Sequence, residues 1–91
     1  MIIAGDYKIT WEHSRPKRIG YGVETKGGLT ICQIKNKLDE VLSQGHALCS
    51  KDENFNKAKG RIVSMTRALK DLKINKSERK FVWEKYFLRN L

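Results

Sequence analysis

The chain has 91 residues, 40% of them hydrophobic and 32% charged, and its formal net charge is +9. This length suits a single domain, residues 1–91, with a small apolar core, and no apolar run approaches the ~18 residues of a membrane-spanning helix. The opening Met-Ile-Ile-Ala-Gly-Asp is too short and too uncharged at its start for a secretory signal, so we expect a cytoplasmic protein.

The positive charge is concentrated in the second half of the chain. Residues 1–50 hold seven Lys or Arg against five Asp or Glu, whereas residues 51–91 hold twelve against five. Such an excess promotes encounter with phosphates and says nothing about the fold. The charge therefore favours an anionic partner, which could be a nucleic acid, a nucleotide or an anionic lipid. Of these we expect a nucleotide or a nucleic acid, and no membrane partner.

The first half of the chain predicts an antiparallel sheet of about four strands. Residues 7–13 alternate apolar and polar side chains and are rich in β-branched and aromatic types, which is typical of a half-buried strand. A loop should follow at residues 14–18, because Pro16 lacks a backbone donor and biases the residue before it to an extended conformation.

A hairpin is the next prediction. Residues 18–26 and 29–35 flank Gly27-Gly28, and a two-residue Gly-Gly connection is a hairpin signal because primed turns need positive φ. The corresponding register places Val23 opposite Cys32.

A turn at residues 36–39 and a further strand at residues 40–49 complete the expected sheet, which forms the β-sheet part of the domain, residues 1–49. A short helix at residues 38–44 is the alternative, since its leucines and valine also have helical spacing. The strand would place one set of side chains on a common face: Val41, Ser43, Gly45, Ala47 and Cys49.

Two helices should make up residues 50–91, which gives an α+β fold. Ser50-Lys-Asp-Glu53 matches a capping box, so the first helix is expected at residues 51–72. Its apolar stripe would be Phe55, Ala58, Ile62, Met65, Leu69 and Leu72, and its opposite, cationic face Lys57, Arg61, Ser64 and Arg67. Gly60 indicates either close packing against a neighbouring element or room for a ligand beside Arg61.

Asn75-Lys-Ser-Glu78 repeats the capping pattern and should open a second helix that ends near Arg89. Large apolar side chains surround most of this helix. We therefore expect it to lie between the sheet and another surface, such as a second subunit.

Catalytic and metal-binding patterns are weak. His46 and Cys49 have a ligand-like separation, but on a strand they would point to opposite faces, and paired short-range zinc ligands are missing from the sequence. Cys32 and Cys49 are expected to be reduced thiols. We expect no metal, no cofactor and no catalytic residue, and hence not an enzyme.

Phosphate binding by arginine is the stronger signal. Arg61 and Lys57 lie one helical turn apart, and a guanidinium can hold a phosphate at two points. Phe55 could stack on a base and Asn56 could read its edge. The alternatives stay open: the cations could form an ordinary solvated face, and Phe55 could belong to the core. Further candidates are Arg15, Arg18, Arg79 and Arg89.

The run from Gly45 to Ile62, together with Thr66-Arg-Ala-Leu69 and Trp83-Glu-Lys-Tyr-Phe87, resembles small phage proteins, among them the Thoeris anti-defence protein 1 family. The resemblance implies an N-terminal antiparallel sheet, C-terminal helices, and assembly as dimers or higher oligomers inside the infected bacterium. It implies sequestration, without cleavage, of cyclic ADP-ribose isomers and in some members of cyclic oligonucleotides. The pocket residues it implies are Phe55, Asn56, Arg61 and Arg67, with Arg18 and Arg89 as further candidates.

Two other functions fit the same sequence. A phage nucleic-acid-binding protein would use the cationic helix face along a phosphate backbone. An inhibitor of a host protein would use the apolar surface at residues 83–88.

Overall fold

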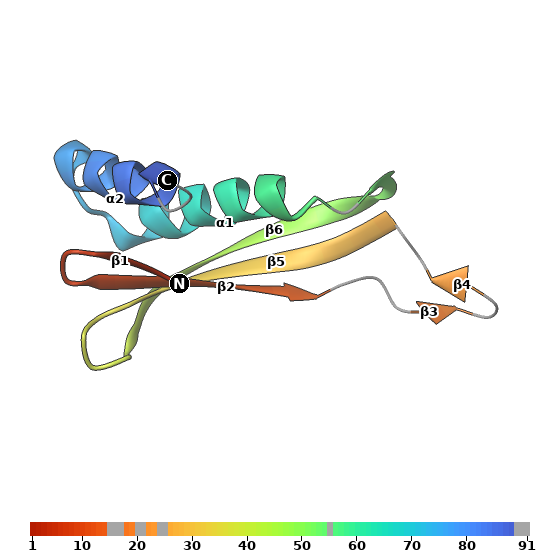
Figure 1. Ribbon diagram of the computed structural model, residues 1–91, viewed down its shortest axis with the longest axis horizontal. Helices are drawn as coiled ribbons and strands as arrows, with labels where there is room; N and C mark the ends of the chain where they lie inside the picture. The colour runs from red at the N-terminus through yellow and green to blue at the C-terminus, as the bar shows by residue number, and fades with distance from the viewer. Residues whose placement is uncertain (15–17, 20–21, 24–25, 55, 89–91) are drawn as a thin grey trace.

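The computed structural model describes residues 1–14, 18–19, 22–23, 26–54 and 56–88. A four-stranded antiparallel sheet carries two helices on one face (Figure 1), so the expected α+β fold is confirmed. The sheet order is β1 (Ile2–Ala4), β2 (Tyr7–Ser14), β5 (Lys26–Lys35) and β6 (Val41–Asn54). The short strands β3 (Arg18–Ile19) and β4 (Gly22–Val23) pair only with each other. The helices are α1 (Lys57–Leu72) and α2 (Lys76–Leu88).

Gly27-Gly28 does not form a turn, so the predicted hairpin is wrong. Both glycines lie inside β5, and Cys32 pairs with Trp11 of β2 and Gly45 of β6 instead of with Val23. Gly28 has a φ of 124°, and the register with β6 shifts between Lys26 and Gly28. Gly28 can adopt this positive φ because it has no Cβ, so the strand can carry an irregularity here without ending.

Strand β1, which the sequence did not predict, supplies the fourth strand of the main sheet and lies at its edge beside β2. The expected strand at residues 18–26 is not part of this sheet between β2 and β5: residues 18–19 and 22–23 form β3 and β4. Strand β1 pairs with β2 through a two-residue Gly5-Asp6 connection in which Gly5 has a φ of 61°. Three residues are too few for an alternating pattern to be recognised, although Gly-Asp is a hairpin signal.

Strand β6 is longer than predicted, and the start of the first helix moves accordingly. Asn54 still pairs with Lys26, so the expected helix start at Lys51 and the capping box at residues 50–53 are wrong. Helix α1 is capped instead by Asn56, whose side chain accepts from the Lys59 amide at 3.1 Å. The turn at residues 36–39 is confirmed, and the alternative helix at residues 38–44 is wrong.

The face that α1 presents to the sheet differs from the predicted stripe. Ser64 and Ala68 are fully buried, whereas Ile62 is 39% exposed. A Cβ at Gly45 would overlap the backbone of Ser64 and Ala68. Close backbone approach through small residues therefore determines which side of α1 faces the sheet, rather than the largest apolar side chains.

Gly60 faces the sheet for the same reason. A Cβ at this position would overlap Oγ1 of the buried Thr30 in β5. The close-packing interpretation of Gly60 is thus confirmed, and the interpretation as room for a ligand is not needed.

Helix α2 begins as predicted. Asn75 Oδ1 accepts from the Glu78 amide at 2.8 Å, and its Nδ2 donates to the Glu78 carboxylate at 3.1 Å. Only Val82 and Tyr86 of this helix are buried, so its wide apolar surface is not covered within the described chain.

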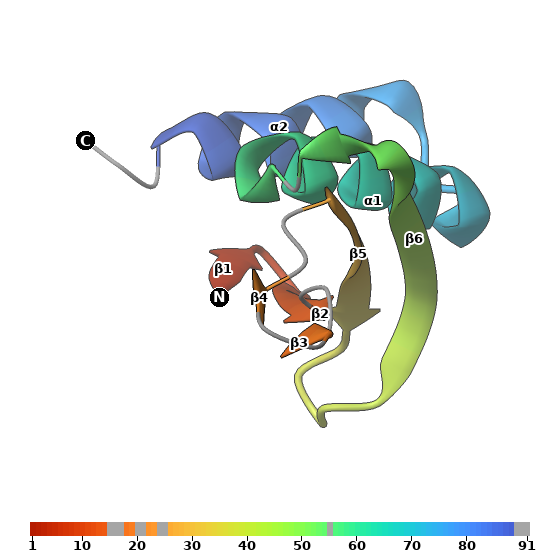
Figure 2. The ribbon, with the colours of Figure 1, turned by 90° about the vertical axis from the view of Figure 1, so that its right-hand side faces the viewer.

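The core lies between the sheet and the helices, and the opposite face of the sheet carries no helix (Figure 2). Helix α1 lies over β5 and β6, and α2 lies near β1. The buried apolar residues are Ile2, Ala4, Ile9, Cys32, Ile34, Ala47, Met65, Ala68, Leu69, Val82 and Tyr86. Neither of these two helices has the length and apolar character needed to cross a membrane.

Candidate functional site

Arg61 connects three elements of the fold. Its backbone carbonyl accepts a hydrogen bond from the Trp11 indole at 3.2 Å, and its Nε donates to the Tyr86 hydroxyl at 3.4 Å. The side chain is half-buried. Arg61 therefore joins β2, α1 and α2, and its guanidinium is held against α2.

Arg67 lies elsewhere. Its Nη1 donates to the His46 carbonyl of the edge strand β6 at 2.6 Å. Arg61 contacts α2 and Arg67 contacts β6, so the two guanidinium groups diverge from α1. Ser64, which the sequence placed on the same cationic face, is fully buried and donates to the Gly60 carbonyl at 2.6 Å, so that common face is wrong.

The remaining predicted site residues do not join Arg61. Asn56 is exposed and its side chain caps α1. Arg18 belongs to β3 in the separate two-stranded sheet, where its backbone pairs with Val23. Phe55 and Arg89 lie outside the described residues. A binding role for these residues stays a prediction.

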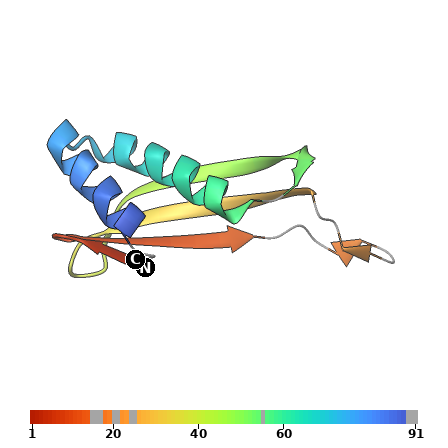
Figure 3. The ribbon, with the colours of Figure 1, turned by 45° about the horizontal axis from the view of Figure 1, so that its top comes forward.

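A groove between the two helices brings cations and an aromatic ring together. After the turn at residues 73–75, α2 diverges from α1 (Figure 3). A cavity of about 360 Å³ lies between them, and its lining residues are Thr66, Leu69, Lys70, Arg79 and Trp83. We call this cavity the helix groove.

Arg79 is fixed in the helix groove by one contact. Its Nη1 donates to the Ile74 carbonyl at 2.7 Å, which is the only hydrogen bond of its side chain to the residues that the structure describes. Four other N–H groups of the guanidinium are left for a ligand. Lys70, in the last turn of α1, supplies a second cation from the opposite wall.

Trp83 is held by other aromatic rings. It stacks on Phe87 with ring centroids 5.9 Å apart and meets the buried Tyr86 edge to face at 5.8 Å. Trp83 also borders a second hollow of about 350 Å³, lined by Lys80, Trp83, Glu84, Phe87 and Leu88. A rigid indole thus separates a cationic hollow from an apolar one.

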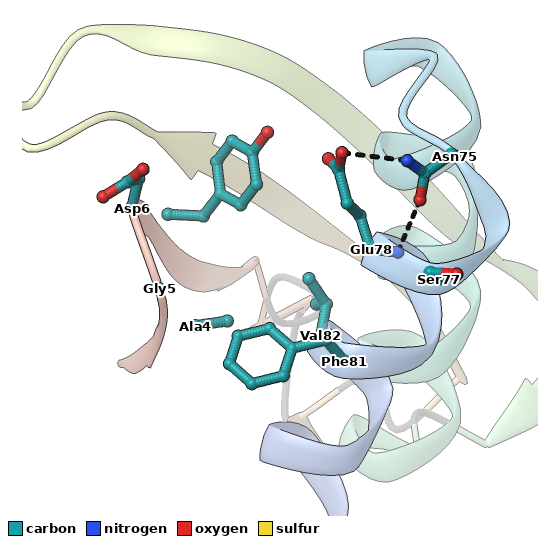
Figure 4. A pocket seen from close by; sticks show the side chains of 9 residues that line it. Ala4, Gly5, Asp6, Asn75, Ser77, Glu78, Phe81 and Val82 are labelled. Carbon is teal, nitrogen blue, oxygen red and sulfur yellow. Dashed lines mark hydrogen bonds between the residues drawn. The ribbon is translucent and has the colours of Figure 1, made fainter.

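A third cavity, of about 460 Å³, has the opposite charge (Figure 4). It lies between the β1–β2 turn and the start of α2, with Asp6, Tyr7, Glu78 and Phe81 among its lining residues. Burial, followed by the nearby Glu78 and Asp6 carboxylates, raises the pKa of Tyr7. A phosphate would be repelled there, so this cavity is not the anion site.

The charge of the helices is not neutralised by their own acids. Residues 57–88 contain ten Lys or Arg and three Asp or Glu. Between described residues the ion pairs are Lys8 with Asp39 at 2.9 Å and Lys37 with Asp6 at 3.2 Å, both in the sheet half. The helical layer therefore presents a positive field to anions.

Within the described part of the chain, no three His, Cys, Asp or Glu side chains gather in a way that could hold a metal ion. His46 and Cys49, whose spacing resembles that of metal ligands, lie three residues apart on β6. Ile31 pairs with His46 and Gly28 with Cys49, so the two positions lie on opposite faces of the strand.

Comparison of the chain with protein families, with curated proteins and with solved structures gave no match.

Sequence reasoning included Arg79 only as a further candidate and left the role of Trp83 open. The spacing contained a usable signal, because Arg79 and Trp83 lie one turn apart on α2, as do Thr66 and Lys70 on α1. Which face of α1 meets α2 depends on the contact of α1 with the sheet, which the sequence did not reveal.

Proposed function

We propose that the protein binds an anionic nucleotide ligand in the helix groove and holds it without cleaving it. One observation carries the proposal: the Trp83 ring and the cations Lys70 and Arg79 line the same cavity. An indole face binds a base by stacking, worth about 1–3 kcal/mol per base. A guanidinium binds phosphate oxygens at two points, and an ammonium adds a second charge.

The ligand we propose is a cyclic nucleotide immune signal: a cyclic ADP-ribose isomer or a cyclic oligonucleotide. Such a ligand carries both a base and phosphates in a small molecule, and the two hollows on either side of Trp83 offer about 360 and 350 Å³. The resemblance to phage anti-defence proteins supports the same class. The protein would then act in the cytoplasm of an infected bacterium as a sponge rather than as an enzyme.

Arg61 has a supporting role in this proposal. It holds Tyr86, and Tyr86 packs against Trp83. In this proposal the helix groove, rather than the predicted cationic face of α1, is the centre of the site. Arg61 contributes by holding Tyr86, which positions Trp83 in the helix groove.

Release of a captured ligand tests the proposal. The purified protein is incubated with an extract of bacteria whose immune signalling is active, filtered, and heated, and the released compounds are identified by mass spectrometry. We expect an intact cyclic nucleotide from the wild type and from Lys85→Ala, whose cation lies over Phe81, outside the lining of the groove. The yield from Arg79→Ala should be strongly reduced. Release of a cleaved product, or retention of a host protein without any nucleotide, would contradict the proposal.

Binding of single-stranded nucleic acid is the second candidate. It is favoured by the continuation of the cations along both helices beyond the groove. Contacts to several phosphates would make log affinity fall with log salt at a slope of about −0.7 per phosphate neutralised. A cyclic nucleotide with two phosphates should show a slope no steeper than about −1.4.

A further inference from the structure

The outer face of the sheet, on the side away from the helices, is not covered by any described segment (Figures 1 and 2). Its side chains come from alternate positions of β2, β5 and β6, and the register arranges them in rows across the strands. From one end to the other the rows are Lys8 with Lys35, then Thr10 with Gln33 and Gln44, then Glu12 with Ile31 and His46, then Ser14 with Leu29 and Leu48.

This face is partly apolar at both of its ends. Leu48 is 77% exposed at one end. At the other end, where β5 turns into β6, Leu38 is 78% exposed and Val41 is 50% exposed. An antiparallel sheet that faces only water normally carries polar residues there, so these aliphatic side chains indicate a contact surface.

Net charge distinguishes this face from the helical layer. The rows of this face hold Lys8, Lys35 and Glu12, a net charge of +1 with His46 neutral. Residues 57–88 hold ten cations against three acids, a net charge of +7. Two copies of the chain would repel each other through their helices but can meet through their sheets.

We infer that the outer face of the sheet is the interface between two copies of this chain. The twofold axis would lie between the two faces, perpendicular to the strands, at the row that contains Gln33. Each row of one copy then lies over the row of its partner that is equally far from Gln33 on the opposite side. Glu12 then lies over the pair formed by Lys8 and Lys35, an opposite-charge contact that occurs twice. Leu48 lies over the end where Leu38 and Val41 are exposed.

The size of the face is adequate for such a contact. Ten residues of β5 at about 3.4 Å each, and the three strands β2, β5 and β6 about 4.8 Å apart, give a flat area of roughly 500 Å², to which the side chains add. A standard interface buries about 800 Å² per partner, so the face with its side chains is close to that range.

Association through the edge of the sheet is less suited to the structure. Arg67 of α1 donates to the carbonyl of His46 on the edge strand β6 at 2.6 Å. A side chain that covers an edge carbonyl hinders the addition of another strand. The proposed dimer therefore uses the face and leaves the helix groove of each copy open. The dimer does not depend on the proposed ligand.

Mass measurement by light scattering during gel filtration tests the interface. We expect a dimer for the wild type and a monomer for Leu48→Glu, a change that leaves the monomer intact because Leu48 is 77% exposed. Leu88→Glu on α2, where the leucine is 54% exposed, is the matched control and should stay dimeric. A monomeric wild type, or dissociation by Leu88→Glu but not by Leu48→Glu, would overturn the inference.

Charge reversal gives a second, independent readout. Glu12→Lys and Lys35→Glu should each weaken the dimer by about tenfold or more, because each places like charges opposite one another. The double variant should recover most of the wild-type dissociation constant, since it restores opposite charges at the same positions. Additive weakening in the double variant would overturn the proposed orientation of the two copies.

Discussion

Arg79 and Trp83 line the helix groove from successive turns of α2, with the guanidinium and the indole bordering the same cavity. This relationship combines a phosphate-binding group with a base-stacking surface. Because Arg79 is fixed by the Ile74 carbonyl and Trp83 by Tyr86 and Phe87, both groups are positioned before a ligand arrives. Such pre-organisation reduces the entropy lost on binding.

Substitution of Trp83 should separate stacking from packing. We expect Trp83→Leu to weaken binding of a cyclic nucleotide by about 5- to 150-fold, the equivalent of one lost stacking contact of about 1–3 kcal/mol. Trp83→Phe keeps an aromatic face and should retain most of the affinity. Isothermal titration calorimetry gives both values, and equal losses in the two variants would show that the ring does not stack on a base.

Arg79→Lys tests whether the planar guanidinium group of Arg79 contributes to ligand binding beyond its positive charge. We expect a loss of affinity in Arg79→Lys because an ammonium cannot make the two parallel contacts of a guanidinium. Lys85→Ala, which removes a full charge outside the groove lining, should bind more tightly than Arg79→Lys in the same titration. The reverse order would indicate that only net charge determines binding.

Arg61→Ala should affect stability more than binding. The substitution removes the hydrogen bond to the buried Tyr86, so we expect the free energy of unfolding to fall by about 0.5–1.5 kcal/mol. The loss of ligand affinity should be smaller than that of Arg79→Ala. Urea denaturation and calorimetry measure the two effects. Unchanged stability with abolished binding would make Arg61 a direct ligand contact.

Two glycine substitutions should differ in severity. A Cβ at Gly45 would overlap the backbone of α1, which cannot move aside without displacing the helix, so Gly45→Ala should cost about 2–3 kcal/mol of stability. A Cβ at Gly60 would meet the Thr30 side chain instead. The helix propensity gained by Ala, about 1 kcal/mol, partly offsets this overlap, so Gly60→Ala should be milder. A larger loss for Gly60→Ala in urea denaturation would contradict the described contact of α1 with the sheet.

The buried thiol of Cys32 should be unreactive. Burial raises its pKa from 9.0 to about 12, so the thiolate is scarce in the folded protein at neutral pH. Because the unfolded chain loses this proton first, the thiol's contribution to stability is present below pH 9 and is lost as the pH rises from about 9 towards 12. In a Cys49→Ser background, alkylation of Cys32 at pH 8 should require unfolding. Rapid alkylation of the folded protein would contradict the burial.

Local sequence patterns predicted those elements that local physics controls. The alternation in residues 7–13 and 43–47 succeeded because one face of each strand is buried against the helices. Val41, predicted on the same face as Ser43, is 50% exposed instead, because the register shifts between Ile34 and Lys35. The cap of α2 succeeded because Asn75 and Glu78 satisfy each other within one turn.

The errors came from contacts that are distant in sequence. Gly27-Gly28 has the composition of a turn, but the pairing of Gly28 with Cys49 of β6 keeps it inside the strand. The capping-box pattern at residues 50–53 was overridden by the pairing of Asn54 with Lys26. The helix groove could not be predicted for a similar reason. Lys70 and Arg79 line the same cavity only because the packing of α1 on the sheet determines which face of α1 is turned towards α2.

The most direct test of the central claim is a two-dimensional nuclear magnetic resonance titration that follows the two indole N–H signals. The signal of Trp83, assigned by its loss in Trp83→Phe, should shift and saturate as a cyclic ADP-ribose isomer is added. The signal of Trp11, whose indole is bonded to the Arg61 carbonyl, should change little and serves as the internal control. A ligand that binds while the Trp83 signal stays fixed, or one that does not bind at all, would contradict the account.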